Sequence, residues 1–139
     1  MEGLYIEPTE TSPKVHFDPE AFSFEISGES RPEDVRKFYK PVLDWFEQYS
    51  NYLYWLTEKY AEGEKKLVQF HFVFEYFNSS SAKYIMDVIA KLGDIQKASP
   101  NAKIQILWHY DEPDEDMKEA GEEFETITNI PFKYIINPD

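Results

Sequence analysis

The stretch Leu67–Lys83 reads LVQFHFVFEYFNSSSAK and decides the predicted architecture. Its first part, Leu67–Phe77, places apolar side chains on both faces of an extended chain. That pattern is typical of a central strand in a sheet whose two faces are both covered by helices. The apolar run ends at Asn78–Ser81, and helical spacing follows from Lys83. Hydroxyl groups are therefore predicted on the turn between a buried strand and a helix.

Length and charge limit the classes of function. A chain of 139 residues fits one domain with a substantial core, and we assign residues 14–139 to it, preceded by a flexible or edge-strand arm at 1–13. The net charge of −13 disfavours nucleic acid and anionic membranes as partners. Without cysteine there is no disulfide, thiolate nucleophile or cysteine-bound zinc. The sequence shows no signal peptide, and no apolar run approaches the length of about 20 residues that a membrane-spanning helix needs. We therefore expect a cytoplasmic protein.

The segments before the opening stretch predict a hairpin. Leu4–Ile6 has the composition of a short edge strand. Val15–Phe17 and Phe22–Ile26 alternate apolar and polar side chains on either side of a turn, which predicts a β-hairpin whose second strand ends at Gly28.

A long helical pattern follows the hairpin. Ser30–Glu33 resembles a capping box, with Ser30 as the cap. Apolar residues at three- and four-residue spacing continue from there, with a kink expected at Pro41. One helix over the whole pattern would be about 40 Å long, so we expect a break near Ser50–Asn51 and a short second helix at Tyr52–Tyr60.

The rest of the chain alternates helices and strands. After the hydroxyl turn we predict a helix that ends near Ser99, a strand at Lys103–Tyr110, a helix at Glu115–Ile127 and a strand at Phe132–Ile136. The predicted fold is α/β, in the order β-β-α-β-α-β-α-β. Its single mixed sheet has an antiparallel first hairpin and mainly parallel strands thereafter.

Sites in such sheets lie at the carboxyl ends of the parallel strands. Here those ends are Asn78–Ser81 and Tyr110–Asp116, which share a rim if their strands are neighbours. The turn at Asn78–Ser81 has two interpretations. Its side chains cap the next helix, or one serine accepts a phosphoryl group that the helix N–H groups and Lys83 then stabilise.

The acidic loop also has several interpretations. Its carboxylates are Asp111, Glu112, Asp114, Glu115 and Asp116. A solvated loop of this kind favours the N-terminus of the following helix. A calcium loop is excluded because no glycine stands at the required place. A weak Mg²⁺ site and a docking surface for a basic partner are the remaining alternatives. Of these two we predict the docking surface and no metal site.

Catalytic machinery is not evident in the sequence. His16, His71 and His109 are scattered among the predicted strands and lack a second ligand at metal-binding spacing. A metal-assisted hydrolase using Asp111, Asp114 and His109 is an alternative, but no nucleophile or oxyanion site accompanies these residues. We therefore predict no catalytic residues and no cofactor.

An aromatic cluster lies near the end of the long helical pattern, at Tyr49, Tyr52, Tyr54 and Trp55. Either it packs under a loop, or it is an exposed patch for a partner or for self-association into a homo-oligomer.

Several motifs in order resemble one family. They are SGESRPE at Ser27–Glu33, FYKPVLDW at Phe38–Trp45, EYFNSSSAK at Glu75–Lys83, WHYDEPDEDM at Trp108–Met117, EAGEEF at Glu119–Phe124 and the pair Pro131–Phe132. By these motifs the chain is identified as a member of the SiaC family of regulatory phosphoproteins, which are similar in fold to STAS domains. Asn51–Lys66 is longer and more aromatic than the resemblance supports.

The resemblance implies a non-enzymatic switch protein. A partner kinase phosphorylates one hydroxyl, a PP2C-type phosphatase removes the phosphate, and the unmodified form binds an effector, which is a diguanylate cyclase in characterised relatives. The family's acceptor is the threonine directly after the asparagine, a position held here by Ser79, with Ser80 and Ser81 as alternatives. Asn78 and Lys83 then shape the phosphosite, and the acidic loop serves partner docking. The alternative is a structural or oligomeric acidic protein whose serines only cap the helix.

Overall fold

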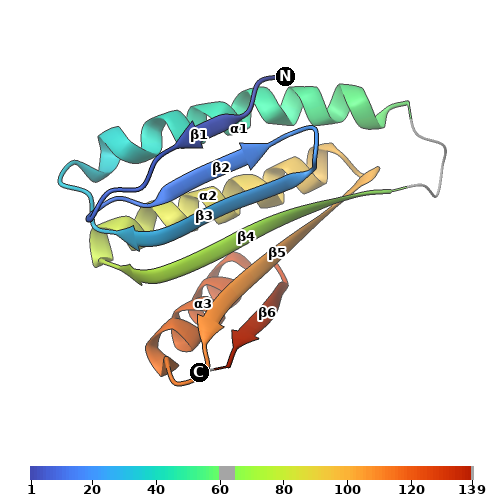
Figure 1. Cartoon of the computed structure of the whole chain (residues 1–139). Helices are drawn as coiled ribbons and strands as arrows, with labels where there is room; N and C mark the ends of the chain where they lie inside the picture. Colours follow the sequence, from blue (N-terminus) through green and yellow to red (C-terminus); the bar gives the residue numbers. More distant parts are fainter. Residues whose placement is uncertain (60–64, 139) are drawn as a thin grey trace.

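The computed structural model describes residues 1–59 and 65–138. Strands and helices follow one another along the chain in the order shown in Figure 1. They are β1 (Leu4–Ile6), β2 (Lys14–Asp18), β3 (Ser23–Ser30), α1 (Val35–Thr57), β4 (Lys66–Phe77), α2 (Ser79–Ala98), β5 (Ala102–Asp111), α3 (Glu115–Thr128) and β6 (Phe132–Asn137).

The described strands form one mixed sheet in the order β1-β2-β3-β4-β5-β6. The first two pairings are antiparallel, with Phe17 opposite Phe24 in the predicted hairpin. The pairings β3–β4, β4–β5 and β5–β6 are parallel. The predicted α/β class and the single mixed sheet, with an antiparallel first hairpin and parallel strands thereafter, are confirmed, and β1 is the edge strand expected at Leu4–Ile6.

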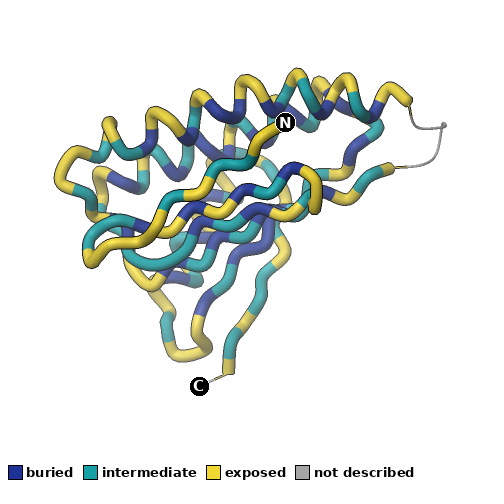
Figure 2. Tube along the Cα trace, turned by 45° about the horizontal axis from the view of Figure 1, so that its top comes forward, coloured by how far each residue is buried: buried dark blue, intermediate teal, exposed yellow. Residues whose placement is uncertain are grey.

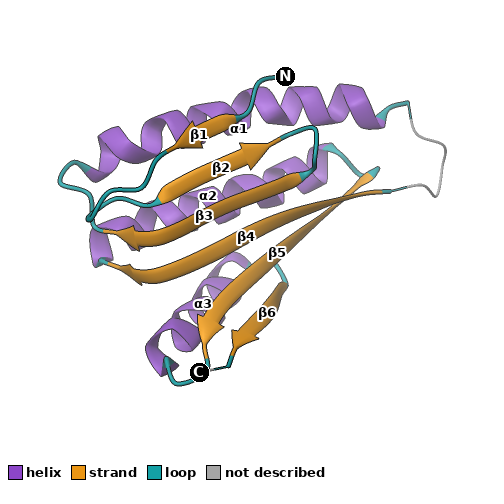
Figure 3. Cartoon of the chain, viewed as in Figure 1, coloured by secondary structure: helices purple, strands orange, loops and turns teal. Residues whose placement is uncertain are grey.

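The helices cover only one face of the sheet, and the prediction of two covered faces is wrong (Figure 3). From β3 onward each parallel strand is added on the same side of the preceding one. Because the crossovers are right-handed, each helix then lands on the same face. In β4 the buried residues alternate accordingly, while Leu67 on the uncovered face is 46% exposed. Covering both faces would require a reversal in the strand order.

Helix α1 is continuous through Ser50–Asn51, so the predicted break is wrong. Its apolar stripe stays in the core as far as Leu53, which is fully buried. A helix of 23 residues is about 35 Å long, and the 12-residue strand β4 spans about 40 Å. The sheet is therefore long enough to support the whole helix. The predicted end at Tyr60 lies outside the described residues.

The start of α1 also differs from the prediction. Its cap is Asp34, whose carboxylate accepts a hydrogen bond from the Lys37 N–H at 3.1 Å. Strand β3 does not end at Gly28 but continues to Ser30, through a shift in register after Gly28, whose φ is 103°. Ser30 therefore pairs with Phe77 inside the sheet and is too early in the chain to cap the helix.

The buried residues lie between the helices and the covered face (Figure 2). Aromatic rings dominate this core. Trp108 on β5 is fully buried and packs against Phe72, Phe124 and Phe132. Gly121 allows α3 to approach this ring, because an added Cβ would lie 2.5 Å from Trp108 Cδ1. This packing fixes α3 against β5, next to the end of β4.

Candidate functional site

The serine turn, residues 78–81, joins the carboxyl end of β4 to α2. Asn78 is the cap of α2, and its Oδ1 accepts a hydrogen bond from the Ser81 N–H at 2.9 Å. The Asn78 N–H donates to the Ser30 carbonyl at 3.1 Å, which joins the turn to the end of β3. The side chain that caps the helix is thus Asn78 rather than a serine, and the turn is anchored on both sides.

A chain of buried hydroxyl groups lies beneath the turn. The Ser30 hydroxyl donates to Ser81 Oγ at 2.9 Å and lies 2.6 Å from the Tyr39 hydroxyl. Ser30, Tyr39 and Ser81 are all fully buried. Burial raises the pKa of Tyr39 to about 12, an effect that the Ser30 hydrogen bond reduces. These contacts join β3, α1 and the first turn of α2 in one network.

The three serines of the turn have different environments. Ser79 and Ser80 are exposed, whereas the Ser81 side chain is held in the buried network. The ammonium group of Lys83 lies 3.8 Å from the Asp87 carboxylate and 4.7 Å from the centre of the Tyr84 ring. Lys83 thus lies along the outer side of α2 in this structure, with its charge one turn further from the serines.

Residues of the acidic loop stabilise the start of α3. Asp114 caps that helix by accepting a hydrogen bond from the Met117 N–H at 3.1 Å. Glu115 and Asp116 occupy the first turn, where carboxylates interact favourably with the helix dipole. Asp111 and Glu112 are exposed, and the Glu112 N–H donates to the Asn137 carbonyl at 2.9 Å, which ties the loop to β6.

The acidic loop and the serine turn lie at the same edge of the sheet but apart from one another. Strands β4 and β5 are neighbours, as the shared-rim expectation required, and their paired region ends at Phe72–Trp108. Beyond that pair the two strands diverge (Figure 1). Helix α3 packs into the space between them, with the Phe124 ring 5.8 Å from that of Phe77. The serine turn and the acidic loop are therefore two separate surfaces rather than one shared rim.

Two of the scattered histidines meet on the uncovered face of the sheet. His71 Nδ1 on β4 lies 2.9 Å from His109 Nε2 on β5. His109 is therefore bonded to another imidazole rather than paired with Asp111. Among the described residues no group of three potential ligands is placed to hold a metal ion. His16 instead packs edge-on against Tyr5 at 4.8 Å.

The histidine pair predicts a pH dependence of stability. Partial burial lowers the pKa of His71 and of His109 below 6.5. As pH falls below 6.5, the unfolded chain takes up protons before the folded protein does, so stability is lost. We expect the urea concentration at the unfolding midpoint to be lower at about pH 5.5 than at about pH 7.5, a range that spans the titration of histidine. The decrease should be smaller in a His71→Gln/His109→Gln variant.

The charged groups next to the histidine pair do not alter the pH dependence expected in this range. Glu25 faces His71 across the sheet. Burial raises the pKa of Glu25, but the Ser27 hydroxyl and Lys14 bring it below 4.5 overall. Glu25 therefore stays ionised throughout the window in both the folded and the unfolded protein. Equal slopes for the double variant and the wild type would contradict the prediction.

The aromatic cluster at the end of α1 is divided between core and surface. Tyr49 is 1% exposed, whereas Tyr54 and Trp55 are 50% and 56% exposed. The Lys59 ammonium lies 3.8 Å from the Trp55 ring centre. Burial raises the pKa of Tyr49, whose hydroxyl has no hydrogen-bond partner among the described residues.

Sequence reasoning missed the network beneath the serine turn and the histidine pair. Both depend on which strands are neighbours and on their register, which places Ser30 opposite Phe77 and Phe72 opposite Trp108. The available signal was a serine beside each of two consecutive strand-to-helix connections, since Ser30 ends β3 and Ser81 lies in the first turn of α2. Its meaning becomes clear only when β3 and β4 lie side by side.

Among the described residues, no helix is long and apolar enough to cross a membrane.

Comparisons with known proteins agree with this architecture. A solved structure of SiaC from Pseudomonas aeruginosa shares the fold with a TM-score of 0.75 and 24% identity, covering 100% of both chains. Another, of the diguanylate cyclase SiaD in complex with its activator SiaC from the same organism, gives 0.72 and 25% identity over 98% of this chain and 99% of that chain.

Sequence comparison extends the likeness to the family level. An uncharacterized protein of Pseudomonas aeruginosa (strain UCBPP-PA14) is 28% identical over 132 residues, which are 95% of this chain and 94% of the relative. The model of the SiaC family, described as SiaC family regulatory phosphoprotein, matches residues 6–137. Since this match spans nearly the whole chain, the protein belongs to the SiaC family of regulatory phosphoproteins.

Proposed function

We propose that this protein is a non-enzymatic signalling switch whose phosphoryl acceptor is Ser79. In the cytoplasm a partner kinase adds the phosphate, a PP2C-type phosphatase removes it, and the unmodified protein binds and regulates an effector. The observation that carries the proposal is the exposed Ser79 hydroxyl in the first turn of α2, directly after the Asn78 cap.

The first turn of a helix suits a phosphoserine. N–H groups at a helix N-terminus have no partner within the helix, and the helix dipole is positive there. A phosphate on Ser79 adds about −1.5 to −2 charges at this end of α2. Ser80 is exposed as well and is the second candidate, whereas a phosphate on Ser81 would have to occupy the buried hydroxyl network.

The rigid setting of the turn suggests how the switch acts. Asn78 is bonded to Ser30 and to Ser81, so the backbone of the turn is held from two sides. A phosphate on Ser79 therefore changes the charge of the exposed edge while the fold is retained. Partner affinity then changes through repulsion or attraction at that edge.

Partner identity follows from the family by analogy. In the similar solved complex, SiaC is the activator of the diguanylate cyclase SiaD. We infer that the effector of this protein is also a diguanylate cyclase. The acidic loop, with Asp111 and Glu112 exposed on the neighbouring corner, then provides a second docking surface for the kinase or the effector.

The test is phosphopeptide mapping of the protein isolated from its own cells, for the wild type and for Ser79→Ala. We expect phosphate on Ser79 in the wild type and none on the serine turn in Ser79→Ala. A Ser80→Ala variant is the matched control, since it removes an exposed hydroxyl from the same turn and should keep the phosphate. Phosphate on Ser80 would retain the switch and reassign the acceptor, and an unmodified turn with the cognate kinase present would refute the proposal.

A further inference from the structure

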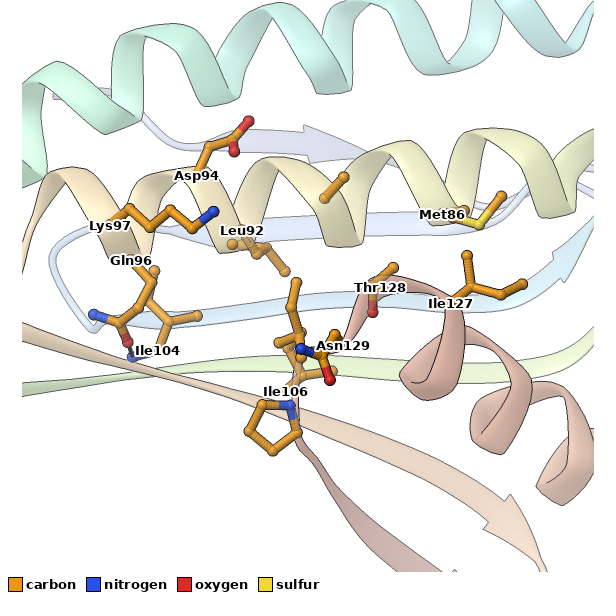
Figure 4. Close-up of a pocket in the computed structure, with 14 residues that line it drawn as sticks. Met86, Leu92, Asp94, Gln96, Lys97, Ile104, Ile106, Ile127, Thr128 and Asn129 are labelled. Atoms are coloured by element: carbon orange, nitrogen blue, oxygen red, sulfur yellow. Dashed lines mark hydrogen bonds between the residues drawn. The ribbon is translucent and has the colours of Figure 1, made fainter.

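A groove separates α2 from α3 over the covered face of the sheet (Figure 4). We call it the α2–α3 groove. Its cavity volume is about 620 Å³, and its main apolar lining residues are Met86, Gly93, Ile104, Ile106, Ile127 and Ile130. Ile127 is 57% exposed, so an isoleucine on the α3 wall faces solvent in this structure.

The walls of the groove follow regular helical spacing. Met86, Ala90, Gly93 and Lys97 line it from α2 at intervals of three and four residues, so they form one ridge of that helix. The ridge is shallow in its middle because Ala90 and Gly93 are small residues. An added Cβ on Gly93 would lie 2.8 Å from Ile130 Cδ1, which shows how closely the segment after α3 approaches α2.

Two of the polar side chains that line the groove, Gln96 and Thr128, are engaged within the chain. The Gln96 amide donates to the Ala102 carbonyl at 2.6 Å and accepts from the Ile104 N–H at 2.8 Å. The Thr128 hydroxyl donates to the Phe124 carbonyl at 2.7 Å. Ligand pockets for polar small molecules usually direct a few free polar groups at the ligand. With Gln96 and Thr128 engaged, the groove presents mainly apolar side chains, and α2 adds one charge of each sign, Asp94 and Lys97.

One flank of the groove is acidic. The Glu125 carboxylate accepts hydrogen bonds from the Phe132 N–H at 2.9 Å and the Tyr134 hydroxyl at 2.6 Å, so that side of α3 faces β6. By helical spacing, the opposite side carries Asp116, Glu123 and Ile127. Asp116 and Glu123 are both exposed. Glu123 therefore lies one helical turn before Ile127, at the edge of the α3 wall, and Asp116 lies about three turns before Ile127 on the same side of the helix.

We propose that the α2–α3 groove binds an amphipathic basic helix of a partner protein. Its apolar side chains enter the cavity, and its Lys and Arg side chains meet Asp116 and Glu123. Helix-in-groove binding uses apolar anchors at this spacing, and the flanking carboxylates supply charge complementarity. A second copy of this chain is disfavoured as the occupant because each copy carries a net charge of −13.

The groove is lined by α2 from Met86 onward, beyond the serine turn. This proposal does not rest on phosphorylation of Ser79, and binding can be tested with unmodified protein. Failure of one proposal therefore leaves the other intact.

The probe is a synthetic, dye-labelled 18-residue peptide of leucine and lysine with a helical apolar stripe (five turns, by about 3.6 residues per turn). A permuted peptide of the same composition lacks the stripe. Anisotropy titrations are made at near-physiological salt, about 0.15 M, where exposed charges are largely screened. The amphipathic peptide should bind at least about tenfold more tightly than the permuted one, because only its apolar stripe can be buried.

Matched variants locate the binding site. Ile127→Gln removes an apolar side chain from the groove, and Ile136→Gln makes the same change on β6, where the isoleucine is 53% exposed. We expect about tenfold weaker binding for Ile127→Gln and a change below about twofold for Ile136→Gln. Glu123→Gln should weaken binding about two- to threefold and reduce its salt dependence.

Two outcomes would overturn the proposal. Equal binding of the amphipathic and permuted peptides would show attraction by net charge alone. Equal affinities for Ile127→Gln and Ile136→Gln would place the peptide outside the groove. Circular dichroism of each variant checks that the fold is retained, since both isoleucines are more than half exposed.

Discussion

Ser81→Asp should lower the free energy of unfolding by at least about 3 kcal/mol. The Ser81 side chain is fully buried, and its hydroxyl accepts a hydrogen bond from Ser30. A carboxylate there is larger than the hydroxyl and carries a charge into a site surrounded by hydroxyl groups. Urea denaturation near pH 7 measures the loss.

Two neighbouring variants separate charge from other effects. Ser80→Asp places the same charge on an exposed position of the same helical turn, where it should stabilise the protein by about 0.3–1 kcal/mol. Ser81→Ala removes only a hydroxyl and should cost about 1 kcal/mol. If Ser81→Asp proved as stable as Ser80→Asp, the buried hydroxyl network would not exist as described. The result bears on the switch, because it decides which serine can carry a phosphate within the native fold.

Trp108→Ala should lower the free energy of unfolding by about 3–5 kcal/mol. Trp108 is fully buried and packs against Phe72 and Phe124, and its indole N–H donates to the Met117 carbonyl at 2.9 Å. Removing the ring leaves a cavity between β5 and α3 and removes the hydrogen bond from the indole to the Met117 carbonyl. Urea denaturation with circular dichroism as the probe measures the effect.

Trp55→Ala is the matched control, since the same residue type is 56% exposed there and contacts Lys59. Its cost should stay within about 0.5 kcal/mol, as for most surface substitutions. A similar cost for both variants would mean that Trp108 does not join α3 to the sheet.

The sequence predicted the elements well where their pattern was strong. The alternating strands, the apolar run of β4 and the spacing of α2 and α3 are local signals, and these elements are all present in the structure. The predictions that failed concerned quantities set by neighbours. The length of α1 depends on the length of the sheet beneath it, and the cap of α1 depends on how far β3 continues past Gly28.

The features of the candidate site also separate into those that the local sequence predicted and those that depend on neighbouring elements. Asn78 followed by serines predicts a turn and a capped helix, because an asparagine side chain accepts a hydrogen bond from the first turn of a helix. The difference among Ser79, Ser80 and Ser81 is not encoded locally. It arises because Ser30 and Tyr39 come from other elements and cover one hydroxyl but not the others.

By itself, the sequence determined the α/β class, the order of the elements, the acidic surface and the position of the serine turn, since periodicity, charge and turn chemistry are properties of neighbouring residues along the chain. Only the tertiary structure decided that one face of the sheet is bare, that His71 meets His109, and that the α2–α3 groove stays open. These features depend on the strand order and on the divergence of β4 from β5. Both result from the packing of all the helices together, which no single segment specifies.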